Sequence, residues 1–348
     1  MCLGRSLDKK STSFALCLVA ATLFTTTVAH ASCDQNIVLK GVNIAGAEFN
    51  GEQLPGVLFK NYVYPNKAEI EYFAGLGANA IRLPFLWERI QPALNSNLAP
   101  AELQNIVATV ALAKAQGLCV ILDLHNYGNY RGNPIGSTQV PVKAFIDVWT
   151  RLAREFDDAS ATAFGLMNEP AHLSVDGWAA AAQQTVNVLR QQHVKNLIMV
   201  SGGRWSGVHD WFSAAGGVSN AQAFAVFHDP EKRMLIEVHQ YADSNYSGTG
   251  QECHAAKNVK GMFDKITSWA SVNGQRLFLG EFGVPANPQC LEALDAMLAH
   301  TQNKAVWRGW TYWAAGQWWG DYPLSIAPVN GKEAAQMAVV KKYFGARQ

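Results

Sequence analysis

The chain has 348 residues, of which 49% are hydrophobic and 16% are charged, and it contains no low-complexity tract. This composition is typical of a globular protein with one large core and excludes a disordered or fibrous chain. The formal net charge is only +1 and the basic residues form no patch, so we expect no nucleic-acid partner.

Residues 1–31 differ from the rest of the chain. Basic residues precede an apolar run at 14–24, and Ala29 and Ala31 frame an A-x-A cleavage site. This order predicts a secretory signal peptide removed after Ala31, hence a secreted protein, extracellular or periplasmic, without a membrane attachment. A retained membrane anchor is the alternative, but the run is shorter than the ~20 residues of a spanning helix. A lipoprotein with a lipidated Cys33 is another alternative. It is less well supported than a cleaved signal peptide, because "HASC" lacks the usual Leu three residues before the Cys.

The remaining chain alternates short apolar runs with amphipathic segments. The expected strands lie at 37–44, 79–85, 119–125, 163–169, 196–202, 234–241, 277–283 and 308–314. The expected helices lie at 101–116, 143–156, 177–193, 259–272, 291–300 and 332–343. Apolar strands alternating with helices indicate a parallel sheet covered on both faces. Eight such units predict an α/β fold, a (β/α)8 TIM barrel forming a single domain over residues 32–348, rather than an open Rossmann-type sheet.

Four cysteines remain after the predicted cleavage. Four cysteines in an exported protein permit disulfides and allow three pairings. We favour Cys253 with Cys290, which closes a 37-residue loop and stabilises the fold by roughly 4 kcal/mol, and Cys33 with Cys119. A metal site is the alternative, but no C-x-x-C or paired Cys/His spacing supports it.

Polar and aromatic residues lie at or near the carboxyl ends of the expected strands. They are Arg82, His125, Asn168, Glu169, His239, Tyr241, Glu281 and Trp313. Barrel enzymes build their sites from these strand ends and the loops that follow, so we expect one shared pocket. Long loops rich in aromatic residues and glycine at 126–139, 242–256 and 314–328 agree with this polarity.

Two carboxyl groups, Glu169 and Glu281, stand out because a pair of carboxyls is the machinery that cleaves a glycosidic bond. One must be protonated to help the leaving oxygen depart, and the other must stay ionised to attack the anomeric carbon. Arg82 and the Tyr241 hydroxyl are candidate partners that keep Glu281 ionised. Glu169 has apolar neighbours in the sequence, which favours a raised pKa.

The segment "FGLMNEP" (164–170) carries the first of these carboxyls. Along a regular strand, Asn168 and Glu169 point to opposite faces, so both can line a pocket only if the strand kinks or bulges. Pro170 restricts the preceding residue to extended backbone angles and cannot donate a ladder hydrogen bond. We therefore expect Pro170 to end the strand with Glu169 in an extended conformation.

The motifs "LMNEP" (166–170) and "LGEFG" (279–283) resemble those of glycoside hydrolase family 5, a family of retaining (β/α)8 glycosidases. The resemblance extends from "GVNIAGAEF" (41–49) to "WTYWAAGQWWG" (310–320), nearly the whole chain after the signal peptide. It implies that Glu169 is the acid/base and Glu281 the nucleophile of a double displacement through a covalent glycosyl-enzyme.

The resemblance also implies substrate contacts: a hydrogen bond from Asn168 to the sugar 2-hydroxyl, and Trp313 as the floor of the cleavage subsite. Other tryptophans near strand ends offer flat faces that suit pyranose rings. The expected substrate-binding residues are Arg82, His125, Asn168, Trp205, His239, Tyr241, Trp313, Trp318 and Trp319.

"GVNIAGAEF" and "GGRWSG" (202–207) resemble the endo-β-1,4-glucanase (cellulase) branch of the family. We therefore predict a secreted, retaining endo-β-1,4-glucanase that acts as a monomer on β-glucan, without a cofactor or a metal.

Three alternatives stay open. A β-mannanase or xyloglucanase shares every catalytic residue. A metal-dependent barrel hydrolase could use Asp123, His125, His239 and Glu281, although "NIAGA" replaces the usual paired histidines at the end of strand one. A non-catalytic carbohydrate-binding barrel has no need of both carboxyl groups.

Overall fold

The computed structural model describes Met1 and residues 33–34, 36–215 and 217–345. Apart from Met1, the predicted signal peptide lies outside these residues. Within them, eight parallel strands close into a barrel in the order β1-β10-β9-β8-β7-β6-β3-β2. The strands are β1 (Leu39–Ile44), β2 (Ala80–Phe85), β3 (Cys119–Leu124), β6 (Thr162–Gly165), β7 (Leu197–Ser201), β8 (Met234–His239), β9 (Leu277–Glu281) and β10 (Trp307–Ala315). The predicted (β/α)8 barrel is confirmed.

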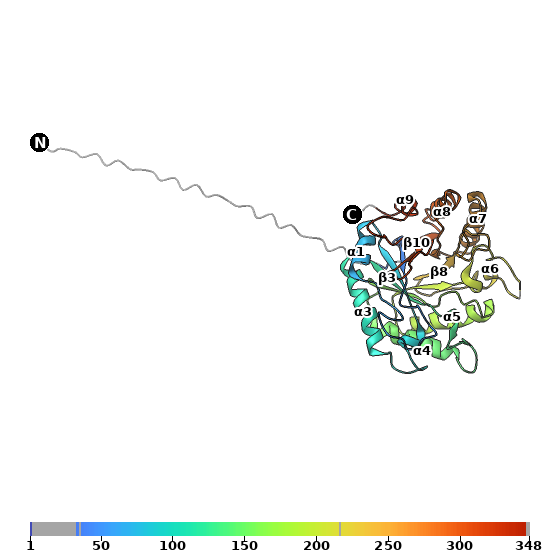
Figure 1. The fold of residues 1–348 in the computed structure, drawn as a ribbon. Coiled ribbons are helices and arrows are strands. Elements are labelled where there is room, and N and C mark those ends of the chain that lie inside the picture. Colours follow the sequence, from blue (N-terminus) through green and yellow to red (C-terminus); the bar gives the residue numbers. More distant parts are fainter. Residues whose placement is uncertain (2–32, 35, 216, 346–348) are drawn as a thin grey trace.

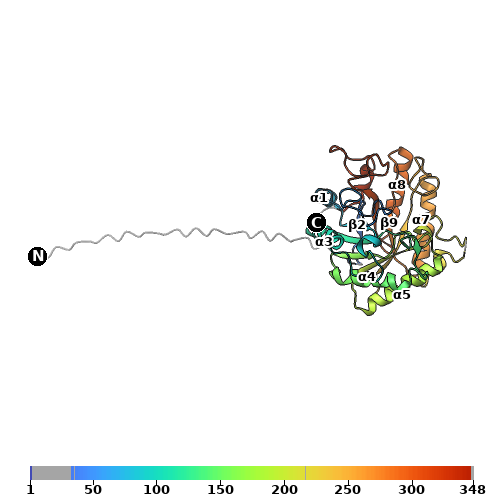
Figure 2. The ribbon, with the colours of Figure 1, turned by 60° about the horizontal axis from the view of Figure 1, so that its bottom comes forward.

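Helices form an outer layer around the strands (Figures 1 and 2). They are α1 (Lys67–Gly75), α2 (Trp87–Ile90), α3 (Pro100–Ala115), α4 (Val142–Glu155), α5 (Val175–Gln191), α6 (Asn220–Ala223), α7 (Ala256–Val272), α8 (Pro288–His300) and α9 (Met337–Val340). In α4, Phe145, Val148, Trp149 and Leu152 are all buried, at the i, i+3, i+4, i+7 spacing of a core-facing stripe. A short hairpin, β4 (Asn129–Tyr130) with β5 (Asn133–Pro134), lies in the loop after β3.

Two predicted elements differ most in extent. The helix expected at 332–343 is limited to α9, and Lys332 instead forms an antiparallel bridge with Val329. The strand expected at 163–169 ends at Gly165, so the segment that carries Asn168 and Glu169 is irregular.

Both predicted disulfides are present: Cys33 with Cys119, and Cys253 with Cys290. Cys119 is the first residue of β3, so the first bridge ties Cys33 to the amino end of the barrel. The second bridge joins the loop after β8 to α8. One therefore lies at the end of the barrel opposite the strand-end carboxyls, and the other beside a loop at the same end as those carboxyls.

Among the described residues, no helix combines the length and the apolar character that a membrane span requires.

Candidate active site

A cavity of about 650 Å³ opens at the carboxyl ends of the strands. The predicted site residues that line it are His125, Glu169, Trp205, His239, Tyr241, Glu281 and Trp313. Arg82 and Asn168 are fully buried and reach this group through hydrogen bonds. The barrel thus brings together residues that are up to 231 positions apart, from Arg82 to Trp313.

Glu169 leaves the barrel wall through an unusual backbone conformation. Its φ of +40° lies in the left-handed region, so the expected extended conformation was wrong. The preceding residue remains attached to the neighbouring strand, because the Asn168 amide donates a 2.9 Å hydrogen bond to the Leu124 carbonyl. The strand therefore ends before this pair, and the turn carries the carboxyl of Glu169 into the cavity.

The carboxylate of Glu281 receives hydrogen bonds on both oxygens. Arg82 Nη1 donates to Oε1 and the Tyr241 hydroxyl donates to Oε2, each at 2.8 Å. Burial by itself raises the pKa of Glu281, but the positive charges of His239 and Arg82 outweigh it, so the pKa lies below the ordinary value. The site therefore favours an ionised Glu281.

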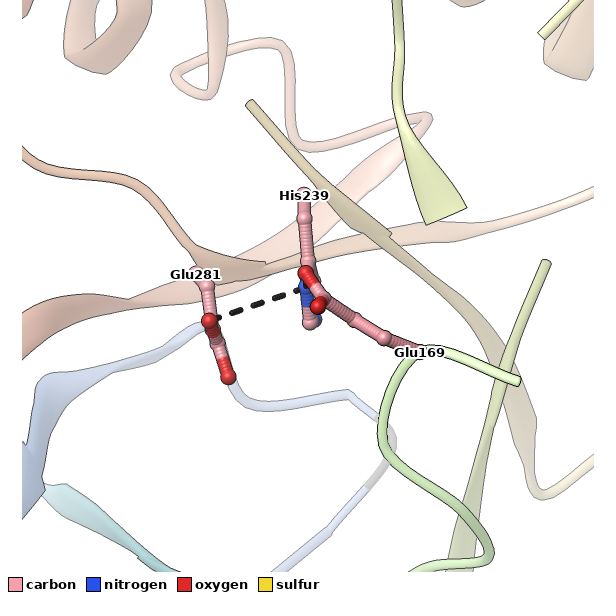
Figure 3. A group of neighbouring side chains, drawn as sticks. All are labelled: Glu169, His239 and Glu281. Atoms are coloured by element: carbon pink, nitrogen blue, oxygen red, sulfur yellow. Dashed lines mark hydrogen bonds and ion pairs between the residues drawn. The ribbon is translucent and has the colours of Figure 1, made fainter. Parts of the chain in front are cut away.

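Glu169 has the opposite bias. Its Oε1 lies 2.8 Å from Nδ1 of His239, and the same nitrogen faces Glu281 (Figure 3). Burial raises the pKa of Glu169, and the hydrogen bond from His239 lowers it by less. Glu169 therefore holds its proton to a higher pH than an ordinary Glu.

His239 is itself held by charges. Its Nε2 lies 3.1 Å from Glu237 Oε1, and its Nδ1 lies 3.8 Å from Glu281 Oε2. Although burial disfavours the charged ring, Glu281 and the hydrogen bonds to Glu169 and Glu237 raise the pKa of His239 to about 10. A cationic imidazole thus contacts Glu169 and faces Glu281.

Arg82 is the electrostatic centre beneath the cavity. Its guanidinium is completely buried and contacts five side chains at 2.8–3.0 Å, namely Asn43, Asp123, Asn168, Glu237 and Glu281. The rigid guanidinium of Arg82 thus holds two amide side chains and three carboxylates in fixed positions beneath the cavity.

Sequence reasoning missed Asn43 and Glu237, and considered Asp123 only as a metal ligand. Asp123 Oδ2 lies 2.7 Å from His125 Nδ1, as Glu237 lies against His239. In both pairs the acid precedes the histidine by two positions, the spacing of residues on one face of a strand. That repeated D-x-H and E-x-H pattern was the available signal.

The aromatic residues separate into three groups. Trp313 stacks on His125 with ring centroids 5.5 Å apart and is 9% exposed. Trp205 lines the same cavity and is 55% exposed. Trp319 lies in an adjoining cavity of about 490 Å³ that shares His125 and Trp313 with the first. Trp318 lines neither of these two cavities.

One oxygen each from Glu169 and Glu281 and one His239 nitrogen lie within 4.8 Å of one another. The distances suit a cation, but the donor chemistry does not. Both His239 nitrogens face carboxylates and the ring holds its proton to about pH 10, so it has no lone pair for a metal. Of the metal ligands considered from the sequence, His239 and Glu281 belong to this cluster, whereas Asp123 and His125 do not.

The family model of Cellulase (glycosyl hydrolase family 5) matches residues 42–316. Endo-beta-1,4-glucanase B of Aspergillus niger is 32% identical over 293 residues, covering 84% of this chain and 85% of the relative. A structure of XacCel5A in complex with cellopentaose has a TM-score of 0.86 and 47% identity, covering 88% of this chain and 99% of that chain. Endoglucanase Cel5A of Pseudomonas stutzeri in complex with cellobiose has a TM-score of 0.81 and 36% identity, covering 88% and 92%. The chain therefore belongs to glycosyl hydrolase family 5, the cellulase family.

Proposed function

We propose that this protein is a retaining endo-β-1,4-glucanase in which Glu281 is the nucleophile and Glu169 the acid/base. The observation that carries the proposal is the pair of carboxyl groups with opposite pKa shifts on one cavity. In the first step Glu281 attacks the anomeric carbon, while Glu169 gives its proton to the departing glycosidic oxygen. In the second step Glu169 takes a proton from water, and that water breaks the ester between sugar and Glu281.

The spacing of the carboxyls supports retention of configuration. Their nearest oxygens lie within 4.8 Å. Inverting enzymes need about 6.5–9.5 Å between carboxyl groups to admit a water, whereas retaining enzymes need about 5–5.5 Å. Proton NMR of the first product tests this step. The β-anomer is expected, and initial release of the α-anomer contradicts retention.

The surrounding residues receive supporting roles under this proposal. Arg82 and Tyr241 keep Glu281 ionised and oriented, which their 2.8 Å hydrogen bonds support. Trp313, against His125 and on the cavity wall, is suited to stack on the sugar at the cleavage point. We assign to Asn168, whose Oδ1 accepts a hydrogen bond from Arg82, the hydrogen bond to the sugar 2-hydroxyl.

The proposed substrate is β-1,4-glucan, because the relatives with high coverage are endo-β-1,4-glucanases and the XacCel5A structure contains cellopentaose. A β-mannanase or xyloglucanase shares the same carboxyl pair. Initial rates on carboxymethylcellulose, galactomannan and xyloglucan separate these activities. Glu281→Gln protein prepared in parallel controls for contaminating enzymes. Negligible hydrolysis of β-glucan with rapid hydrolysis of another polymer overturns the substrate assignment.

Two further tests distinguish the proposed glycosidase from a metal-dependent hydrolase and from a non-catalytic carbohydrate-binding protein. A metal-dependent hydrolase loses activity in a chelator, whereas the proposed mechanism uses no cation. A non-catalytic carbohydrate-binding barrel has no activity to lose when Glu169 or Glu281 is replaced by Gln.

We also propose that residues 1–31 are a signal peptide and that residues 32–348 form the secreted, monomeric catalytic domain. Two disulfides support an oxidising compartment. Sequencing the amino terminus of exported protein should give Ser32, and a start well inside or before this position contradicts the assignment.

A further inference from the structure

The loop after β7 contains a backbone conformation that ordinary residues avoid. Arg204, Trp205 and Ser206 have φ values of +56°, +58° and +56° in succession. L-residues visit the left-handed region at a cost, and non-glycine residues rarely do so consecutively. Such a segment persists only where the surrounding structure over-determines it, and strain of this kind gathers at functional sites.

Asn220, the first residue of α6, holds Gly203, the residue that precedes this left-handed turn. Its Oδ1 accepts a 2.8 Å hydrogen bond from the Gly203 amide, and its Nδ2 donates a 3.0 Å hydrogen bond to the Gly203 carbonyl. The Asn220 side chain thus bonds both backbone groups of one residue, as a neighbouring strand would. Asn220 is completely buried, so no water competes for these two bonds.

The exit from the turn is fixed separately. The Ser206 hydroxyl donates a 2.6 Å hydrogen bond to the Glu237 carbonyl on β8 and accepts a 2.8 Å hydrogen bond from the Gly202 amide. The first turn residue is also held, because Arg204 pairs with Asp210 at 2.8 Å. The two ends of the turn are therefore anchored to α6 and to the barrel wall.

Trp205 lies at the centre of this turn, and its side chain is exposed. Trp205 is 55% exposed although it is a large aromatic residue, and it lines the same cavity as Glu169 and Glu281. A flat aromatic face beside the carboxyl pair is suited to the apolar face of a pyranose ring. The strain and the anchoring bonds both act on the orientation of this indole.

We propose that Asn220 is a positioning residue that holds the left-handed turn at 204–206, so that Trp205 stands as a stacking platform for a hexopyranose unit beside the cleavage point. This inference rests on the proposed glycosidase function. Asn220 itself touches neither the substrate nor the carboxyl pair, and it acts through the backbone of Gly203. Its contribution therefore depends on the presence of the indole.

A double-mutant cycle with cellopentaose as substrate tests this dependence. In Asn220→Ala we expect kcat/KM to fall about 10-fold, mainly through KM, because one sugar-aromatic stack is misplaced. In a Trp205→Ala background the same Asn220 substitution should cause no further loss. Equal losses in the two backgrounds, or no loss in either, overturn the proposal.

Gln222→Ala provides a matched structural control on the same helix. Gln222 forms the capping box of α6 with Ser219 and makes no bond to the turn, so this variant should retain the cellopentaose KM. If it reproduces the Asn220→Ala loss, a general loosening of α6 is responsible and the positioning role is overturned.

A replacement variant and the activity of the wild-type protein complete the test. If Asn220→Ala does not fold, Asn220→Asp replaces it in the cycle, because it keeps the acceptor for the Gly203 amide and loses only the donor. Wild-type protein without activity on cello-oligosaccharides overturns the proposed function. Active wild type with additive substitutions overturns the positioning role alone.

Discussion

His239 Nδ1 lies 2.8 Å from Glu169 Oε1 and so joins the raised-pKa carboxyl to the same imidazole that faces Glu281. The ring is cationic, with a pKa of about 10, and its charge lowers the pKa of Glu281 more than any other neighbouring group does. In Glu169, burial outweighs the same imidazole, because Arg82 and Tyr241 contact only Glu281 of the two carboxyl groups. One barrel end thus supplies a proton donor and an ionised nucleophile at the same pH.

Replacing Glu169 by Gln removes the proton donor but nearly keeps its shape. General acid catalysis contributes about 10²–10⁴-fold, so we expect kcat on cello-oligosaccharides to fall by that factor. Formation of the glycosyl-enzyme from 2,4-dinitrophenyl cellobioside should fall far less, because its leaving group needs no proton. Burst kinetics measure this step, with Glu155→Gln on the surface of α4 as control. Equal losses on both substrates contradict the assignment of Glu169.

Replacing Tyr241 by Phe removes one hydrogen bond to the Glu281 carboxylate. A hydrogen bond to a charged group contributes about 1.5–3 kcal/mol, so the lowered pKa of Glu281 should rise by about one to two units. Activity requires ionised Glu281, hence the acidic limb of the kcat/KM profile should move to higher pH. Tyr72→Phe, whose hydroxyl contacts Glu333 instead, is the control. An unmoved acidic limb argues against Glu281 as the ionised partner.

Glu48 on the loop after β1 should make stability depend on pH. Its Oε2 accepts a 2.8 Å hydrogen bond from the Gly46 amide, while Oε1 is buried without a hydrogen-bond partner in the described structure. Burial raises the pKa of Glu48 from 4.5 to about 7, against a smaller effect of His125.

The folded protein therefore keeps this proton up to about pH 7, whereas the unfolded chain releases it near pH 4.5. Stability is lost as pH rises through this window, by about 3 kcal/mol. In Glu48→Gln that loss should disappear. Urea unfolding of both proteins at pH 5 and pH 8 measures the difference, and a parallel decline of the two is inconsistent with a buried, protonated Glu48.

The two disulfides should differ in their effect on activity. Removing Cys253–Cys290 with paired Ala substitutions should lower the free energy of unfolding by about 4 kcal/mol and raise KM, because the loop after β8 lines the cavity. Removing Cys33–Cys119, with a sequence separation of 86, should lower stability at least as much but leave KM unchanged. Loss of stability is read from denaturant midpoints. Equal KM values for both variants contradict the link to the loop.

The barrel could be predicted because mostly apolar strand segments alternate with helical segments along the chain. The end of the strand before Glu169 could not be predicted. The positive φ of Glu169 depends on tertiary contacts such as the hydrogen bond from the Asn168 amide to the Leu124 carbonyl. Helix α1 was missed, although Asn66 and Glu69 form a capping box at its start. Glu169 and Glu281 could be predicted as a pair, because both lie at the carboxyl ends of expected strands. The buried partners of Arg82 depend on which strands become neighbours, and that is a property of the closed barrel.

Covalent trapping of the intermediate tests the assignment of Glu281 as the nucleophile. 2,4-Dinitrophenyl 2-deoxy-2-fluoro-β-cellobioside forms the glycosyl-enzyme and slows its hydrolysis, because the fluorine destabilises the positively charged transition state. Mass spectrometry of the intact protein and of its peptides locates the sugar. We expect one 2-fluorocellobiosyl group, attached to Glu281. Active enzyme that carries no adduct, or an adduct on Glu169, contradicts this assignment.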